Sequence, residues 1–360
     1  MQMKICQSFK MLKISSAVYF LICLTIIGGI NSIFQQQMKA SNLPHNHKQI
    51  SSPLAKPQLA ASPLFRIIQN GKYGFIDQTG KIIIEPQFDL AWNFIDGRSQ
   101  IKVDEKYGYI DNTGKKVIPP QFRLAYSFSN GLALVVTNYQ YGYIDINGNM
   151  VIKPEFDQAL AFTEGLAAVQ INDKYGYINP LGKIAIQPKF DGARHFSEGL
   201  AAVQIGNKWG YINPQGLLVI KPQFDEVIKF SQGLAPVQIG NKWGYINAKG
   251  LLVIKPQFDQ VREFTEGLAV VQIGDKCGYI NSNGEIAIKL EFERAAIFSQ
   301  GLAAVSIDNK YGYIDSKGKI IIPPKFDLAL SFTSDLALVY IDGKAGYIDK
   351  IGQFIWQPTK

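Results

Sequence analysis

The feature that most constrains this chain is a short aromatic block that recurs every 34 residues. A clear copy is Lys208-Trp209-Gly210-Tyr211-Ile212-Asn213. Its glycine stands at nine positions in fixed register: Gly74, Gly108, Gly142, Gly176, Gly210, Gly244, Gly278, Gly312 and Gly346. A unit repeated at a fixed step stacks on its own copies, which predicts a single elongated or ring-shaped repeat domain.

One unit, residues 190–223, predicts an antiparallel β-meander. The apolar run 200–205 has strand length, Gly206-Asn207 is a two-residue hairpin signal, and residues 208–213 form the next strand. After a tight turn, residues 217–220 form another strand, which Pro222 ends because proline lacks the backbone N–H. The Phe-Asp segment before residue 200 is a weaker additional strand. The fold class is therefore all-β, a tandem array of nine such repeats.

The turn after the aromatic block has two special positions. Its glycine takes the positive φ that other residues avoid, and it occurs at Gly80, Gly114, Gly148, Gly182, Gly216, Gly250, Gly284, Gly318 and Gly352. The residue that opens the turn alternates between Asp and Asn: Asp77, Asp111, Asp145, Asn179, Asn213, Asn247, Asn281, Asp315 and Asp349. Either side chain can cap a turn, whereas a catalytic or calcium-binding carboxylate would not tolerate Asn. We interpret this position as structural.

The aromatic residues predict the core. Glycine inside a strand indicates that another backbone or a ring lies close to it, and we expect an aromatic ring of the adjacent unit. Two phenylalanine series follow the same step, represented by Phe190 and Phe196, and are interpreted as core residues. Exposed aromatic faces are the sharper alternative, with Trp209 and Trp243 as candidate interaction residues.

Two geometries can bury the faces of such units. An open superhelical stack has capping units at its ends, and a β-propeller-like ring closes on itself. The array starts near Phe65 without a Phe-Asp segment, and its last unit is complete by itself. Since a closed propeller commonly shares one blade between both ends, we expect the open, solenoid-like stack. The closed ring is the alternative.

The N-terminus predicts export. Lys4, Lys10 and Lys13 precede an apolar run at about residues 14–30, which is typical of a signal peptide or an uncleaved signal anchor with a transmembrane helix. The predicted organisation is a signal segment at residues 1–34, a flexible Gln/Ser/Pro-rich tether at residues 35–63 and the repeat domain at residues 64–360. The repeats are expected outside the cytoplasm, in the periplasm, at the cell surface or anchored to the membrane.

Charge and cysteine content exclude several classes. The net charge of +8 comes from scattered Lys and Arg without a block of like charges, so nucleic-acid binding is not expected. The repeats contain one cysteine, Cys277, which excludes a disulfide scaffold. The one histidine of the array, His195, is expected to be an exposed variable position. No motif for a nucleophile, a phosphate loop or a metal is present, so we expect no enzyme activity, no cofactor and no metal site.

The block Lys-Trp/Tyr-Gly-Tyr/Phe-Ile-Asp/Asn, followed by Gly, a β-branched run, Pro and Phe-Asp, resembles the bacterial WG-repeat (KWG) proteins. The resemblance covers about residues 65–358 and is strongest at Lys208-Trp209-Gly210 and Lys242-Trp243-Gly244. Cys277 and Ala345 depart from the pattern at the first aromatic position. The resemblance implies an exported or cell-envelope β-repeat protein, and it supplies no catalytic residue and no cofactor.

These observations lead to three hypotheses. The first is a non-catalytic extracytoplasmic scaffold that binds a protein or an extended polymer at the cell envelope, since stacked repeats present one long surface. The second is a carbohydrate-binding module that holds a glycan on exposed Tyr and Trp faces. The third is a structural spacer without a ligand. Membrane contact through an uncleaved N-terminal segment is compatible with each.

Overall fold

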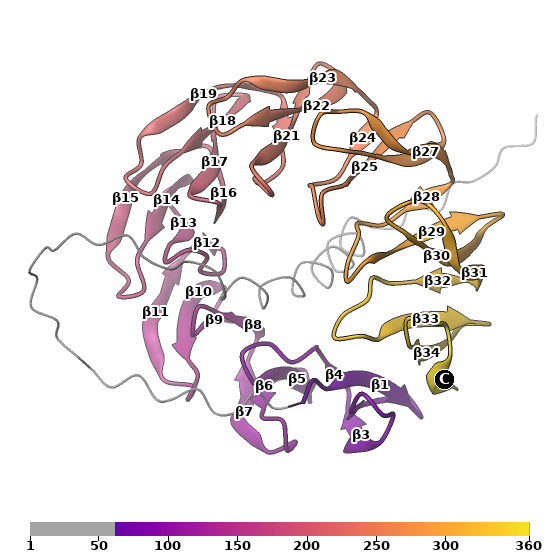
Figure 1. Cartoon of the computed structure of the whole chain (residues 1–360). Helices are drawn as coiled ribbons and strands as arrows, with labels where there is room; N and C mark the ends of the chain where they lie inside the picture. Colours follow the sequence, from indigo (N-terminus) through magenta and orange to yellow (C-terminus); the bar gives the residue numbers. More distant parts are fainter. Residues whose placement is uncertain (1–61, 360) are drawn as a thin grey trace, which may run out of the picture. The chain divides into compact units, whose positions relative to one another are not determined.

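The computed structural model describes residues 62–359, so the predicted signal segment and nearly all of the predicted tether lie outside the described residues. Every regular element of the described domain is a β-strand, which confirms the all-β prediction. The strands form nine antiparallel sheets, of which the first has three strands and each of the others has four. The sheets follow one another as blades around a common axis (Figure 1). Below, blades are numbered in chain order.

The first strand of a blade lies nearest the axis in Figure 1, and within residues 62–359 blade 1 has no such strand. In most blades it is only two residues long, which fits the weak additional strand that the sequence predicts. The first strands of blades 2 to 9 are β4 (Leu90–Ala91), β8 (Leu124–Ser129), β12 (Gln158–Ala159), β16 (Gly192–Ser197), β20 (Glu226–Val227), β24 (Gln260–Val261), β28 (Arg294–Ala295) and β32 (Leu328–Ala329).

The second and third strands form the central hairpin of each blade. The second strands are β1 (Phe65–Gln69), β5 (Ser99–Val103), β9 (Leu132–Thr137), β13 (Ala167–Ile171), β17 (Leu200–Ile205), β21 (Leu234–Ile239), β25 (Ala269–Ile273), β29 (Leu302–Ile307) and β33 (Ala337–Ile341). The third strands carry the aromatic block and are β2 (Lys72–Ile76), β6 (Lys106–Ile110), β10 (Gln140–Asp145), β14 (Lys174–Ile178), β18 (Lys208–Ile212), β22 (Lys242–Asn247), β26 (Lys276–Ile280), β30 (Lys310–Asp315) and β34 (Lys344–Ile348).

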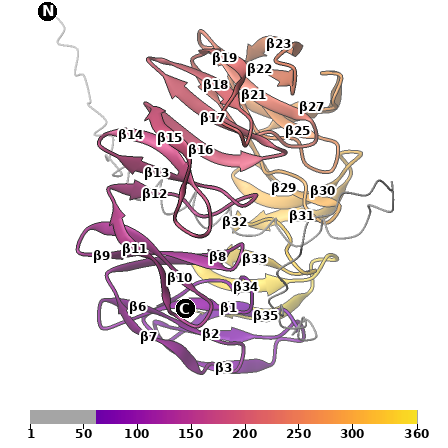
Figure 2. The same ribbon diagram turned by 90° about the vertical axis from the view of Figure 1, so that its left-hand side faces the viewer.

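The fourth strands form the outer edge of the ring, as Figures 1 and 2 both show. They are β3 (Ile82–Phe88), β7 (Lys116–Phe122), β11 (Met150–Phe156), β15 (Ile184–Phe190), β19 (Leu218–Phe224), β23 (Leu252–Phe258), β27 (Ile286–Phe292), β31 (Ile320–Phe326) and β35 (Phe354–Thr359).

A bulge between the third and fourth strands explains the signature glycine. Trp209 pairs with Phe224 and Tyr211 with Ile220, so the fourth strand spans four residues where the third spans two. The extra backbone lies against Gly210, where an added Cβ would approach the Ile220 carbonyl and lie 2.6 Å from Pro222 N. The expectation that an aromatic ring of the next unit fills this space is therefore wrong. The backbone of the same blade fills it.

Aromatic pairs join neighbouring blades. In the first eight blades, the second aromatic of the block meets a phenylalanine of the next blade with ring centroids 4.8 to 5.0 Å apart. These pairs are Phe75–Phe94, Tyr109–Phe128, Tyr143–Phe162, Tyr177–Phe196, Tyr211–Phe230, Tyr245–Phe264, Tyr279–Phe298 and Tyr313–Phe332. The phenylalanines of these pairs are core residues, as the sequence predicts, and the core is a series of inter-blade layers.

The array closes into a ring, so the expected open stack is wrong and the propeller-like alternative is confirmed. The Tyr347 ring of blade 9 lies 5.5 Å from the Phe65 ring of blade 1, and its hydroxyl donates to the Arg66 carbonyl at 2.8 Å. Phe65, Ile67, Leu336 and Tyr347 belong to one buried cluster. Both views accordingly place the end of the chain beside β1 (Figures 1 and 2).

A large-for-small exchange explains how blade 1 closes the ring without a first strand. In blade 5, Phe196 of the first strand pairs with Ala201 of the second strand. The residues equivalent to Ala201 in the other four-stranded blades are small: Ser99, Ala133, Ala167, Ala235, Ala269, Ala303 and Ala337. Blade 1 has Phe65 at this position. Its ring fills the volume that the phenylalanine of a first strand fills elsewhere, so no blade has to be shared between the two ends.

Candidate functional surface at the inner edge of the ring

The residues of the signature block make contacts that stabilise the fold. Lys208 pairs with Asp225 at 2.5 Å, and the second oxygen of Asp225 accepts the Gly240 N–H at 2.8 Å. These contacts, with the Lys208 hydrogen bond as the largest contribution, lower the pKa of Asp225. Tyr211 donates its hydroxyl to the Ile228 carbonyl of the next blade at 2.9 Å. Burial raises the pKa of Tyr211 well above its usual range, so the ring remains a neutral donor.

The candidate residue Trp209 is buried, with 8% of its surface exposed. The Arg194 guanidinium lies over its ring at 4.6 Å from the centroid, a cation–π arrangement. Arg194 is itself fixed by hydrogen bonds to the Val227 carbonyl at 2.8 Å and to the Glu226 carboxylate at 2.7 Å. The ring face that a sugar would require is thus occupied by the protein.

The second candidate, Trp243, is half-buried and packs against the buried cluster that contains Tyr245 and Phe258. Trp209 belongs to a different core cluster, so the structure does not bring the two tryptophans together in one site. Their geometry is that of packing residues. Interaction through these two side chains stays a prediction.

The turns between the first and second strands form a pattern that the sequence reasoning missed. Their central residues take a positive φ near 50° and are Asp96, Asn130, Glu164, Glu198, Gln232, Glu266, Gln300 and Ser334. From blade 3 to blade 8 their side chains reach the next turn. For example, the Glu198 carboxylate accepts the Gln232 N–H at 2.7 Å and the Gly233 N–H at 2.9 Å. The recurring triplet of Ser or Thr, a polar residue and Gly is the sequence signal that could have predicted these hydrogen bonds between blades.

One side chain varies around the ring at the position two residues before each of these turns, which is also two residues after an alanine or valine of the first strand. This inner-edge ring consists of Asn93, Ser127, Ala161, His195, Lys229, Glu263, Ile297 and Ser331. Each member precedes a phenylalanine that packs between blades, as His195 precedes the buried Phe196. The inner-edge ring therefore changes its chemistry where the surrounding scaffold repeats.

Blades 5 to 7 concentrate ionisable groups on the inner-edge ring. His195 Nδ1 lies 3.2 Å from the Ala161 carbonyl, and Lys229 Nζ lies 3.8 Å from the Glu263 carboxylate. His195 is half-buried, so the expectation of an exposed position is wrong. Burial lowers the pKa of His195, and the positive charge of Lys229 adds to this effect, although the Ala161 carbonyl opposes it.

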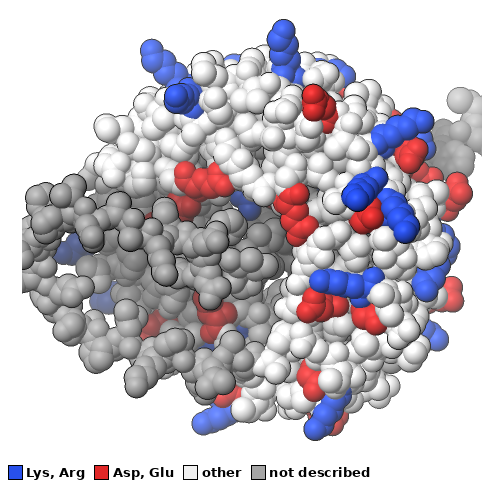
Figure 3. Space-filling model, viewed as in Figure 1, with Lys and Arg blue, Asp and Glu red and all other residues white. Residues whose placement is uncertain are grey.

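Charge is distributed unevenly over the visible face of the ring. Several acidic side chains lie toward its centre and others beside basic ones at the right-hand rim, whereas most Lys and Arg lie toward its outer edge (Figure 3). The turn residues Glu164, Glu198 and Glu266 contribute acidic groups, and each accepts a backbone N–H from the next blade. An anion would therefore meet repulsion on this side of the inner edge, whereas cationic or neutral polar groups would not.

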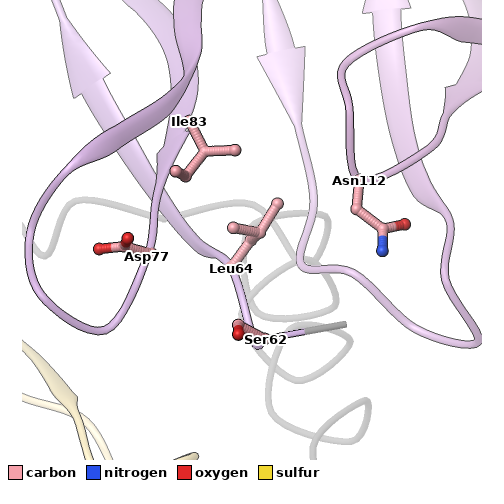
Figure 4. Close-up of a pocket in the computed structure, with 5 residues that line it drawn as sticks. All are labelled: Ser62, Leu64, Asp77, Ile83 and Asn112. Carbon is pink, nitrogen blue, oxygen red and sulfur yellow. The ribbon is translucent and has the colours of Figure 1, made fainter. Parts of the chain in front are cut away.

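A shallow pocket of about 260 Å³ lies between blades 1 and 2. Ser62, Leu64, Asp77, Ile83 and Asn112 line it, and Figure 4 shows Leu64 and Ile83 at its apolar side. The Asp77 carboxylate already accepts hydrogen bonds from Thr79 and from the Lys81 N–H. With its one acid engaged in the turn, this pocket offers no catalytic constellation.

Residues 62–359 contain neither a cluster of metal-ligating side chains nor a membrane-spanning helix. Within residues 62–359, no group of three or more His, Cys, Asp and Glu side chains could hold a metal ion. Cys277 is buried at the position of the first aromatic, and burial raises the pKa of its thiol. No helix in this part of the chain is long and apolar enough to cross a membrane.

The fold and its repeated contacts define a nine-bladed, β-propeller-like ring of one repeated meander. The family model described as the WG containing repeat matches residues 73–107, 107–140, 141–175, 175–209, 209–243, 243–277, 278–311 and 311–344. The chain belongs to this WG-repeat family.

Solved structures share the architecture at low sequence identity. A eukaryotic initiation factor is 11% identical, with a TM-score of 0.57, over 83% of this chain and 98% of its own. BamB from Moraxella catarrhalis is 13% identical, with a TM-score of 0.43, over 81% of this chain and 90% of its own. The likeness to the initiation factor shows the fold alone, because the sequence identity is low. The likeness to BamB has a TM-score below 0.5 and supports no conclusion about this chain. No curated protein matches the chain.

Proposed function

We propose that this chain is a non-catalytic scaffold, held outside the cytoplasm at the cell envelope, that binds a protein or an extended polymer. The observation that supports the proposal is the inner-edge ring, where Ala161, His195, Lys229, Glu263 and Ile297 follow one another in successive blades. Side chains that vary on a repeated scaffold give one face a distinct chemistry, which recognition requires and packing does not.

Binding fits this surface better than catalysis. His195 and the Lys229–Glu263 pair make contacts from blade to blade, His195 with the Ala161 carbonyl and Lys229 with the Glu263 carboxylate, and neither contact involves a hydroxyl or thiol. We assign no catalytic residue and no cofactor. The glycan alternative has less support, because Arg194 covers the face of Trp209.

The location outside the cytoplasm rests on the N-terminal sequence. Lys4, Lys10 and Lys13 before the apolar run at residues 14–30 form the pattern of an export signal or signal anchor. N-terminal sequencing of the protein recovered from fractionated cells tests this part. A chain found in the cytoplasmic fraction with Met1 intact would contradict it.

The test of binding compares two variants of the full chain in pull-downs against envelope proteins and cell-wall polymers. The inner variant carries His195→Ser, Lys229→Ser and Glu263→Ser, because serine already occupies this position as Ser127 and Ser331. The control carries Lys153→Ser and Glu155→Ser on β11, which are both exposed. We expect the inner variant to lose the partner that the wild type and the control retain. Equal retention by both variants, or no partner at all as for a spacer, would contradict the proposal.

A further inference from the structure

The outer edge of blades 4 to 6 differs from the rest of the ring in charge. The turns and fourth strands of these blades, residues 179–190, 213–224 and 247–258, contain no Asp or Glu. The turn opens with Asn in these blades and with Asp in blades 1 to 3, 8 and 9. The exchange is not needed for folding, because Asn213 accepts the Gln215 and Leu217 N–H groups at 3.1 and 3.0 Å, just as Asp111 accepts two N–H groups in its own turn. Its consequence is the loss of negative charge.

The same sector exposes apolar side chains. After the turn glycine, blades 5 and 6 carry Leu217 and Leu251, which are 63% and 61% exposed, where blades 1 and 2 carry Lys81 and Lys115. We name the exposed set that follows these glycines the leucine ridge: Leu217, Leu218, Val219, Leu251, Leu252 and Val253. Contiguous apolar surface of this kind marks a binding site more often than chance exposure does.

The two halves of the leucine ridge are contiguous. A Cβ at Gly250, in the turn of blade 6, would lie 3.1 Å from Ile220 Cγ2 of β19. The turn that presents Leu251 is therefore packed directly against the strand that presents Leu218 and Val219. Figure 1 shows β19 and β23 following each other along the outer edge.

Lysines flank the leucine ridge without ion-pair partners. Lys183, Lys221, Lys249 and Lys255 are exposed, and none of them is within ion-pair distance of a carboxylate in residues 62–359. By contrast, lysines of the third strands, such as Lys208 and Lys242, pair with an aspartate. In Figure 3 the outer edge above β19 and β23 is mostly white, with basic side chains projecting from it.

We propose that the leucine ridge and its four lysines dock the repeat domain on an anionic lipid surface. Apolar side chains that enter the interface, surrounded by lysines and free of acids, match the chemistry of such a surface, and each lysine adds to the attraction. A second copy of the same edge would bring lysines against lysines. Addition of a partner strand is opposed by Pro188, Pro222 and Pro256, which remove N–H donors from these edge strands.

The test places an environment-sensitive dye at one site of the full chain. Cys6→Ser and Cys23→Ser remove the other two thiols of the sequence, and the buried Cys277 stays unlabelled. The dye is attached at Leu217→Cys or, as the matched control, at Lys81→Cys, which occupies the same repeat position in blade 1. We expect vesicles of phosphatidylglycerol and phosphatidylcholine to shift the emission of the dye at residue 217 to the blue but not that of the dye at residue 81. Vesicles of phosphatidylcholine alone should shift neither.

A charge variant separates this contact from any contribution of the N-terminal segment. Lys221→Gln with Lys255→Gln should weaken the shift at residue 217, requiring roughly 30-fold more anionic lipid. No shift at residue 217, an equal shift at residue 81, or a shift that does not depend on anionic lipid would overturn the proposal. A blue shift at residue 217 caused by an acidic protein, without any response to vesicles, would overturn the lipid proposal and assign the surface to a protein partner. Each of these outcomes is independent of the inner-edge binding test.

Discussion

The junction between blades 5 and 6 and the seam between blades 9 and 1 solve the same packing problem with different residues. At the regular junction, Tyr211 packs on Phe230 of a first strand and donates to the Ile228 carbonyl. At the seam, Tyr347 packs on Phe65 of a second strand and donates to the Arg66 carbonyl. The comparison shows that one phenylalanine in place of alanine replaces the aromatic contact of a missing strand.

The largest expected effect comes from removing the seam residue. Phe65→Ala should cost about 3–5 kcal/mol of unfolding free energy, because a buried ring is lost and no first strand is present to fill the cavity. Denaturant unfolding followed by circular dichroism measures it. The matched variant is Ala201→Phe, which puts the seam residue opposite Phe196 in a regular blade and should cost about 1–3 kcal/mol through overpacking. An unchanged midpoint for Phe65→Ala would contradict the role of the ring in closure.

The turn glycines sharpen the comparison. Gly80 and Gly216 have φ values of 84° and 74°, so alanine at either position costs about 1–2 kcal/mol from the left-handed backbone alone. A Cβ at Gly216 would also meet the Ile186 side chain at 2.8 Å, which can move, whereas one at Gly80 would meet the Ile355 backbone carbonyl. We expect Gly80→Ala to be the more destabilising in the same denaturation assay. The reverse order would show that blade 1 is not held against β35.

The hydroxyls of Tyr347 at the seam and Tyr211 at the regular junction should contribute similarly to the free energy of unfolding. Tyr347→Phe and Tyr211→Phe each leave one carbonyl without its donor, at a cost of about 1–3 kcal/mol. Thermal or denaturant unfolding of the two variants measures the difference from wild type. If Tyr347→Phe were neutral while Tyr211→Phe was destabilising, the seam would be looser than the regular junctions.

The smallest effect is expected at the inner edge. Burial lowers the pKa of His195 below its usual value of 6.5, so the unfolded chain takes up this proton at a higher pH than the folded ring does. Stability should therefore decrease as the pH falls below about 6.5 and level off once the folded state is also protonated. His195→Ser should remove this part of the pH dependence in unfolding curves at several pH values. An identical pH dependence in the variant would show that His195 titrates as in the unfolded chain.

The sequence predicts the repeated features well because they follow from local chemistry. The hairpin at Gly206-Asn207 and the positive φ of Gly216 depend on residues within one unit, whereas the predicted strand end at Pro222 is wrong, because β19 continues through this proline to Phe224 at the outer edge of the blade. The closed ring could not be derived in this way. It depends on Phe65 meeting Tyr347 across 282 positions of sequence, and a phenylalanine in an apolar strand gives no local sign of its partner.

The inner-edge ring was only partly predictable. The sequence identifies His195 as a variable position of the array, but not its partial burial or its contact with the Ala161 carbonyl of the preceding blade. Trp209 is a candidate interaction residue in the sequence because it is the largest aromatic of its block. The residue that covers it, Arg194, occurs at a position where nearly all other blades have an apolar residue, so sequence reasoning had no basis for the contact.

Ring closure can be measured directly with two spin labels. Gln78 Nε2 donates to the Ser334 carbonyl at 3.1 Å across the seam, so labels at Gln78→Cys and Ser334→Cys, in a chain with Cys6→Ser and Cys23→Ser, should lie close together. The closed ring predicts a continuous-wave paramagnetic resonance spectrum broadened by dipolar coupling relative to the two singly labelled proteins. A doubly labelled spectrum equal to the sum of the singly labelled spectra would place the two ends apart, as in an open stack, and would contradict the ring.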